Sequence, residues 1–70
     1  MLLPDGSMIK NDVIESFNAA VANDENVRAD GSINWDFVDS DMCMDLSGLY
    51  SFDYINECLE VLADDYEGVA

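Results

Sequence analysis

The chain has 70 residues, which is enough for one small domain, residues 1–70, with a thin core. It contains 16 Asp and Glu residues and only two basic residues, Lys10 and Arg28, so its net charge is −14. This charge argues against direct binding to nucleic acid or to an anionic membrane. A hydrophobic content of 50% is too high for an obligately disordered chain.

Most catalytic and metal-binding side chains are scarce. There is no His, and the two cysteines, Cys43 and Cys58, form no CxxC pair. We therefore expect no enzymatic activity, no cofactor and no metal site. Both thiols are expected to be buried and reduced, with a disulfide between them as the alternative. No apolar run approaches the about 20 residues that span a bilayer, and no secretory signal is expected, so we predict a cytoplasmic protein that does not bind membranes.

The first third of the chain predicts a turn and a helix. Pro4 to Ser7 has the composition of a β-turn, because Pro presets the second turn position and Gly closes it. Asp12 to Ala22 has apolar residues at helical spacing, with Asn11 as the expected N-cap. Asn23 to Asn26 ends this helix, and a loop follows at Ala29 to Ser32.

One segment of that loop resembles the second half of an EF-hand calcium loop. It runs from Asp30 to Phe37 and has Gly and Ile at the appropriate positions. However, Arg28 would stand at a ligand position, and Phe37 would stand where a closing Glu is needed. We therefore expect no calcium site.

Residues 33–47 fit two structures. As a helix, Asn34 is its N-cap, and one side is formed by Trp35, Val38, Met42 and Leu46. As a hairpin, residues 33–37 and 42–46 alternate in polarity around a turn at 39–41. We favour the helix because Asp is depleted in strands and because Gly48-Leu49 has the pattern of a helix stop, with Gly left-handed and the next side chain packing back. The expected fold is a mostly α, three-helix domain, with an α+β helix–β-hairpin–helix domain as the alternative.

The third predicted helix runs from Phe52 to Tyr66, with Ser51 as its N-cap. Its apolar stripe has helical spacing and consists of Ile55, Cys58, Leu59, Leu62 and Tyr66. The opposite side of the same helix carries only acidic residues. We call this row the acidic seam: Asp53, Glu57, Glu60, Asp64 and Glu67.

Folding alone does not explain the acidic seam. At about 1.5 Å rise per residue, its five carboxylates extend over about 21 Å, with no Lys or Arg among them. Like charges at i,i+4 cost about 0.2–0.5 kcal/mol per pair, and anions near the C-terminus of a helix oppose its dipole. A local rule that is broken repeatedly without a structural gain indicates function.

Four aspartates of the middle segment extend the acidic surface: Asp36, Asp39, Asp41 and Asp45. Duplex DNA about 28 Å long, the expected diameter of this domain, carries about 17 phosphate charges. The 16 carboxylates of the chain are of the same order. The sequence therefore predicts a protein that imitates a phosphate backbone and binds a basic nucleic-acid-binding protein through these nine residues.

In charge, size and acidic helix, the chain resembles the small acidic inhibitors carried by phages and mobile elements, many of which are DNA mimics. Anti-restriction proteins, uracil-DNA glycosylase inhibitors and several anti-CRISPR proteins belong to this class. The resemblance rests on no motif, and these proteins share no single fold. It implies a phage-encoded, non-catalytic inhibitor that acts in the host cytoplasm on a restriction, CRISPR, polymerase or nuclease system.

Three further possibilities remain open at this point, of which the homodimer is compatible with both the inhibitor and the adaptor. An adaptor or antitoxin-like module would bind one protein through apolar residues around Trp35 and Met42. A homodimer would pair the apolar sides of the third helix. A merely soluble acidic protein would have all its carboxylates solvated and no specific partner.

Overall fold

Three α-helices make up most of the chain: α1 (Asn11–Ala22), α2 (Trp35–Asp45) and α3 (Phe52–Tyr66). A short 3-10 helix, η1 (Asp24–Asn26), follows α1. The computed structural model describes residues 2–68, and within them the only β pairings are isolated bridges between Leu2 and Met8 and between Val27 and Ile33. The three-helix prediction is therefore confirmed, and the hairpin alternative for residues 33–47 is wrong.

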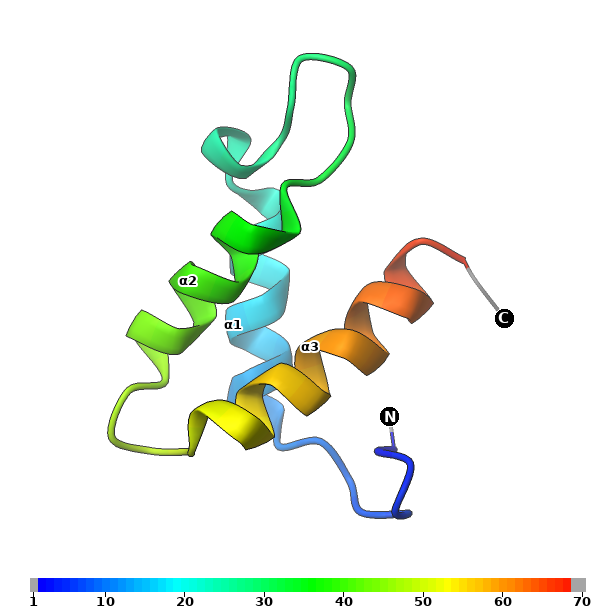
Figure 1. Cartoon of the computed structure of the whole chain (residues 1–70), viewed down its shortest axis with the longest axis vertical. Coiled ribbons are helices and arrows are strands. Elements are labelled where there is room, and N and C mark those ends of the chain that lie inside the picture. The colour runs from blue at the N-terminus through cyan, green and yellow to red at the C-terminus, as the bar shows by residue number, and fades with distance from the viewer. Residues whose placement is uncertain (1, 69–70) are drawn as a thin grey trace.

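The helices form a flat arrangement of 35 × 30 × 17 Å, with a radius of gyration of 11.7 Å. Figure 1 shows α1 behind α2 and α3, which diverge from the loop that connects them. The longest dimension exceeds the about 28 Å expected for a sphere of this length. One reason is the loop of residues 27–34, which extends beyond the helices at the end of the domain where α2 begins (Figure 1).

All three helices and the N-terminal segment contribute to one core. The helical periodicity explains which side of each helix is buried, because the apolar side chains recur every three or four residues. Met42 and Ile55 are among the largest side chains with no exposed surface. The core consists of Leu3, Ile9, Val13, Phe17, Ala20, Val38, Met42, Leu46, Ile55, Cys58 and Leu62.

The start of α1 corrects one prediction. The N-cap residue is Lys10 and not Asn11, which is the first helical residue. The carbonyl oxygen of Lys10 accepts hydrogen bonds from Val13 and Ile14, and its N–H donates to the Tyr54 hydroxyl at 3.4 Å. This contact with α3 accompanies a helix start one residue earlier than local sequence predicts.

The ends of α2 confirm two predictions and correct another. Asn34 is the N-cap residue, although its side chain caps no N–H group and its Oδ1 is buried without a hydrogen-bond partner. Gly48 has the predicted left-handed backbone, with φ of +83°. Leu49 does not pack back, because 65% of it is exposed. Tyr50 packs against the core instead, and its hydroxyl donates to Asp12 at 2.8 Å.

Two Asp-Gly-Ser turns precede α1 and α2 with the same geometry. In each turn the Ser N–H and hydroxyl donate to the Asp carboxylate, with hydroxyl distances of 2.6 Å in both Asp5–Ser7 and Asp30–Ser32. The glycines have φ of +89° and +88°. Each turn is closed by one of the two isolated β-bridges. The second turn belongs to the loop of residues 27–34, which leads into α2.

Candidate acidic interface

The acidic seam lies on the exposed side of α3. All five of its residues are exposed, whereas Ile55, Cys58 and Leu62 on the other side are buried in the core. Ile55, Cys58 and Leu62 of the apolar stripe are thus covered within a single chain, whereas Leu59 is half-buried and Tyr66 is exposed. The seam residues are Asp53, Glu57, Glu60, Asp64 and Glu67.

The two ends of α3 give the acidic seam different electrostatic environments. The Ser51 hydroxyl accepts a hydrogen bond from the Tyr54 N–H at 3.2 Å, which confirms Ser51 as the N-cap. Asp53 lies in the first turn, where the helix dipole favours an anion. Asp64 lies in the last turn, where the helix dipole opposes an anion, and no basic residue in that turn compensates for it. The C-terminal half of the seam is therefore the electrostatically costly half.

The four aspartates of α2 do not form one row with the seam. Asp36 and Asp45 are exposed, whereas Asp39 and Asp41 are half-buried. The Asp41 carboxylate accepts a hydrogen bond of 2.7 Å from the Asn26 side chain, and Asp39 lies 3.7 Å from the Cys43 sulfur. Two of the four thus also have partners within the domain.

Different hollows border the two acidic groups. Asp41 and Asp45 line a shallow hollow beside α1. Glu57, Glu60 and Asp64 line another, together with Pro4 of the N-terminal segment. The structure therefore brings the seam residues of α3 together, whereas the α2 aspartates are divided between two sides of that helix, with only Asp41 and Asp45 sharing a hollow.

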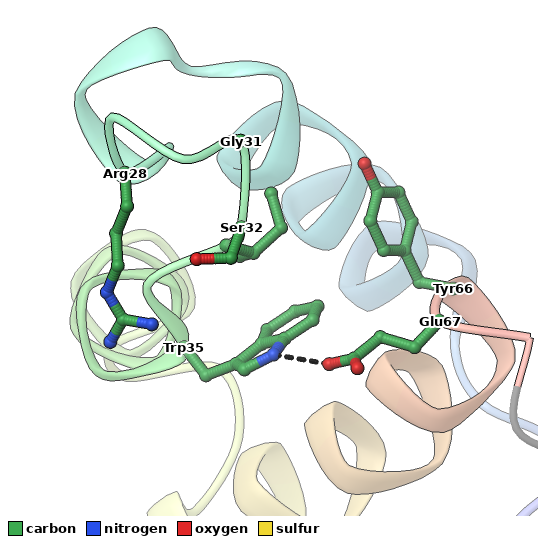
Figure 2. Close-up of a pocket in the computed structure, with 7 residues that line it drawn as sticks. Arg28, Gly31, Ser32, Trp35, Tyr66 and Glu67 are labelled. Carbon is green, nitrogen blue, oxygen red and sulfur yellow. Dashed lines mark hydrogen bonds between the residues drawn. The ribbon is translucent and has the colours of Figure 1, made fainter.

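Glu67, at the end of the seam, has a second role. Its Oε1 accepts a hydrogen bond of 2.6 Å from the Trp35 indole Nε1–H (Figure 2). Trp35 also stacks on Phe17, with ring centroids 6.1 Å apart, and meets the edge of Tyr66 at 6.0 Å. Tyr66 was predicted in the apolar stripe, and it is 52% exposed beside this aromatic group.

Arg28 was not predicted as a site residue, but it lies at the same end of the molecule. It lines a pocket with Trp35, Tyr66 and Glu67 (Figure 2). No spacing rule connects residue 28 with residue 67, because their place in one pocket depends on how the loop of residues 27–34 folds relative to the end of α3. The two Asp-Gly-Ser turns were the signal in the sequence that could have indicated how this loop folds.

The structure changes the set of residues that could form the apolar docking surface of an adaptor-like module. Met42 has no exposed surface and cannot contact a partner, because it packs between the helices. Phe37 and Met44, seven residues apart on the outer side of α2, are 53% and 79% exposed. On α2 the large exposed apolar side chains are therefore Phe37 and Met44, beside half-buried Trp35, and Met42 is not part of any docking surface.

The remaining chemistry is sparse in the described chain. No group of three Cys, Asp or Glu residues within 2–68 is arranged to hold a metal ion. Cys43 and Cys58 are free thiols, Cys58 buried as expected and Cys43 only half-buried. Burial raises the pKa of both thiols, and the Asp39 carboxylate adds to the effect at Cys43. None of the helices in residues 2–68 is long and apolar enough to cross a bilayer.

Comparisons with protein-family models, with curated proteins and with solved structures found no match to this chain. Its function must therefore be argued from its own residues.

Proposed function

We propose that this protein is a non-catalytic inhibitor that occupies the basic groove of a nucleic-acid-binding protein in place of the nucleic acid. The observation that carries the proposal is the acidic seam, whose five carboxylates are all exposed on one side of α3. An origin in a phage or mobile element, acting on a host defence or replication enzyme, is part of the proposal and follows from the resemblance described above.

The spacing of the seam supports this function. From Asp53 to Glu67 the helix rises about 21 Å, at about 1.5 Å per residue. One strand of duplex DNA carries about six phosphates over the same length, at about 3.4 Å each. Four carboxylates on one side of α3, with Glu67 at its C-cap, are close to that density. A basic groove that binds one strand would therefore meet a comparable number of charges on α3.

The charge also explains how the protein would act without chemistry. A net charge of −14 on a domain of this size produces a strong field that steers it toward a basic surface. Such complementarity increases the rate of association more than it slows dissociation, and it weakens as salt is added. Inhibition would be by occupation of the groove, with the nucleic acid as competitor.

The test combines affinity capture with charge reversal on α3. The immobilised protein is incubated with bacterial lysate and washed at low and at high salt, and bound proteins are identified by mass spectrometry. We expect one dominant nucleic-acid enzyme that survives moderate salt and is displaced by DNA. The triple variant Glu57→Lys, Glu60→Lys, Asp64→Lys should lose this enzyme while keeping or increasing its thermal stability, because like-charge repulsion on α3 is removed.

A matched control separates the seam from net charge. Glu15, Asp24 and Glu25 are also exposed, but they lie on α1 and η1. Reversing these three to Lys changes the net charge by the same amount and should leave most of the binding intact. If both triple variants lose binding equally, or if a spread of basic proteins is lost at modest salt, the charge is generic and the proposal fails.

The exposed pair Phe37 and Met44 supports a second candidate function, an adaptor or antitoxin-like module that binds one protein through α2. Salt distinguishes the two functions. Apolar docking should change little between the low-salt and high-salt washes and should be lost in the double variant Phe37→Ser, Met44→Ser. Binding through the seam should show the opposite pattern.

A further inference from the structure

A pocket of about 370 Å³ lies between the loop of residues 28–33 and the end of α3. Its volume is near the lower end of the about 300–1,000 Å³ typical of small-molecule sites, which suits one side chain better than a nucleotide. Figure 2 shows the loop on one side, Tyr66 and Glu67 on the other, and the Trp35 indole at its base. The lining residues are Arg28, Gly31, Ser32, Ile33, Trp35, Tyr66 and Glu67.

Aromatic rings form the apolar part of this pocket. The Trp35 ring is nearly parallel to that of Phe17, at an interplanar angle of 13° and a centroid distance of 6.1 Å, so the two rings form an offset stack. Tyr66 stands almost perpendicular to the indole, at 84°. A guest in the pocket would therefore meet the Trp35 and Tyr66 rings, which attract cations through their quadrupoles.

Glu67 supplies the polar part. Its Oε1 is held by the Trp35 indole, while its Oε2 has no hydrogen-bond partner among the described residues. The carboxylate is thus fixed beside the aromatic rings with one oxygen available to a donor. The net charge of the chain, −14, adds to the negative charge of Glu67, so the pocket favours a cationic guest and disfavours an anionic one.

We propose that this pocket binds an arginine side chain of the partner protein, with its guanidinium group over the aromatic rings and an N–H donated to Glu67. A guanidinium group is planar, stacks on aromatic faces and pairs with carboxylates, so it suits this combination better than an ammonium group. The inference rests on the proposed function. It adds that the basic groove is recognised at the end of the seam by one anchored arginine as well as by distributed charge.

The charge of Arg28 distinguishes a cationic guest from an anionic one. It is exposed on the rim of the same pocket, where its positive charge repels a cationic guest. Removing that charge should therefore strengthen binding of a guanidinium group. If the pocket instead served a carboxylate or phosphate, Arg28 would be its natural partner, and removing the charge would weaken binding.

The experiment uses the full chain and Trp35, its only tryptophan, as the reporter. Trp35 fluorescence is titrated with the chloride salt of N-acetyl-arginine methylamide, which replaces sodium chloride so that ionic strength stays constant. We expect saturable binding that is about threefold or more weaker in Glu67→Gln, the size expected for an exposed charged contact. N-acetyl-leucine methylamide should not bind.

Asp65→Asn is the matched control, because it removes one negative charge from the end of α3 outside both the pocket and the acidic seam. It should leave the affinity for the arginine probe nearly unchanged, and Arg28→Gln should increase it. The proposal is overturned if the probe does not saturate the signal, if Glu67→Gln and Asp65→Asn weaken binding equally, or if Arg28→Gln weakens it.

These outcomes are separate from those of the charge-reversal test. If the triple reversal on α3 abolishes capture but the probe does not bind, the phosphate mimicry stands and the arginine anchor is wrong. If the probe binds as expected but the triple reversal has no effect, the pocket stands and its partner is not held by the seam.

Discussion

The indole Nε1–H of Trp35 donates a hydrogen bond of 2.6 Å to Oε1 of Glu67 and so joins the first residue of α2 to the residue that follows α3. The chain links these helices directly only at their other ends, through the loop of residues 46–51 (Figure 1). The bond therefore lies across the open side of the domain. Because the acceptor is a carboxylate, the bond is stronger than one between neutral groups.

Replacing Glu67 by Ala removes this acceptor. We expect a loss of about 0.5–1.5 kcal/mol in the free energy of unfolding, less than for a buried bond to a charged group, because this bond is exposed and the variant also removes an anion that opposes the helix dipole. Glu67→Gln keeps an oxygen acceptor and removes an anion from the C-terminal end of α3, so its stability should stay near that of the original chain. Thermal unfolding followed by circular dichroism measures both. The single indole N–H signal in the NMR spectrum should shift more in the Ala variant, and equal shifts in the two variants would contradict the hydrogen bond.

Met42 and Met44 give a matched test of the core. Met42 has no exposed surface, whereas Met44 is 79% exposed two residues further along the same helix. Met42→Ala should cost about 2–5 kcal/mol, because it leaves a cavity between the helices. Met44→Ala should change stability by less than about 0.5 kcal/mol. Urea denaturation of the two variants checks the prediction, and similar costs would show that α2 is rotated about its axis.

Periodic features of the sequence predicted the fold well. The α3 bounds, the Ser51 cap and the left-handed Gly48 all follow from local rules that operate within one helix. The start of α1 was missed by one residue, because helix ends are the least precisely encoded feature of local sequence and Lys10 has no capping side chain to mark it. Periodicity also identified Met42 as a core position, although the apolar docking alternative had included it.

The candidate site was only partly predictable. The exposure of the acidic seam follows from the apolar stripe on the other side of α3, since the two rows are opposite on one helix. The partners of Glu67 and Asp41 were not predictable, because Trp35 is 32 residues from Glu67 and Asn26 is 15 residues from Asp41 in the chain. Pairing of that kind depends on how helices pack, which one-dimensional spacing does not encode.

The two Asp-Gly-Ser turns predict a specific pH dependence. Hydrogen bonds from Ser7 lower the pKa of Asp5, and those from Ser32 lower the pKa of Asp30. Because the folded pKa values lie below the unfolded value of about 3.9, both carboxylates stabilise the fold above that pH. This stabilisation is lost as the pH falls through the folded pKa values.

Carboxyl NMR titration should therefore place Asp5 and Asp30 below about 3.9. The difference in unfolding free energy between the original chain and the double variant Asp5→Asn, Asp30→Asn should be largest near neutral pH and shrink on acidification. Asp24→Asn is the control, since no side-chain hydrogen bond to Asp24 is present among residues 2–68 and η1 tolerates Asn. If the difference in unfolding free energy for the double variant does not change with pH, the serine hydrogen bonds do not stabilise the charged carboxylates.

The two cysteines differ in exposure and should differ in reactivity. Burial raises the pKa of both thiols, so each is less ionised at pH 8 than an exposed cysteine, and the thiolate is the reactive form. Cys58 has no exposed surface and should be alkylated by iodoacetamide only on unfolding, whereas half-buried Cys43 should react slowly in the folded chain. Peptide mass spectrometry with and without urea measures the two rates.

Asp39 refines this prediction, because its carboxylate lies 3.7 Å from the Cys43 sulfur and disfavours the thiolate there. Asp39→Asn removes the negative charge, should lower the pKa of Cys43 and should therefore speed its alkylation at pH 8. Asp45→Asn is the matched control, since it removes an equal charge from α2 and, unlike Asp39, Asp45 accepts no hydrogen bond from a thiol in residues 2–68. Equal acceleration by both variants would mean that Cys43 responds to the net charge of the domain rather than to its neighbour.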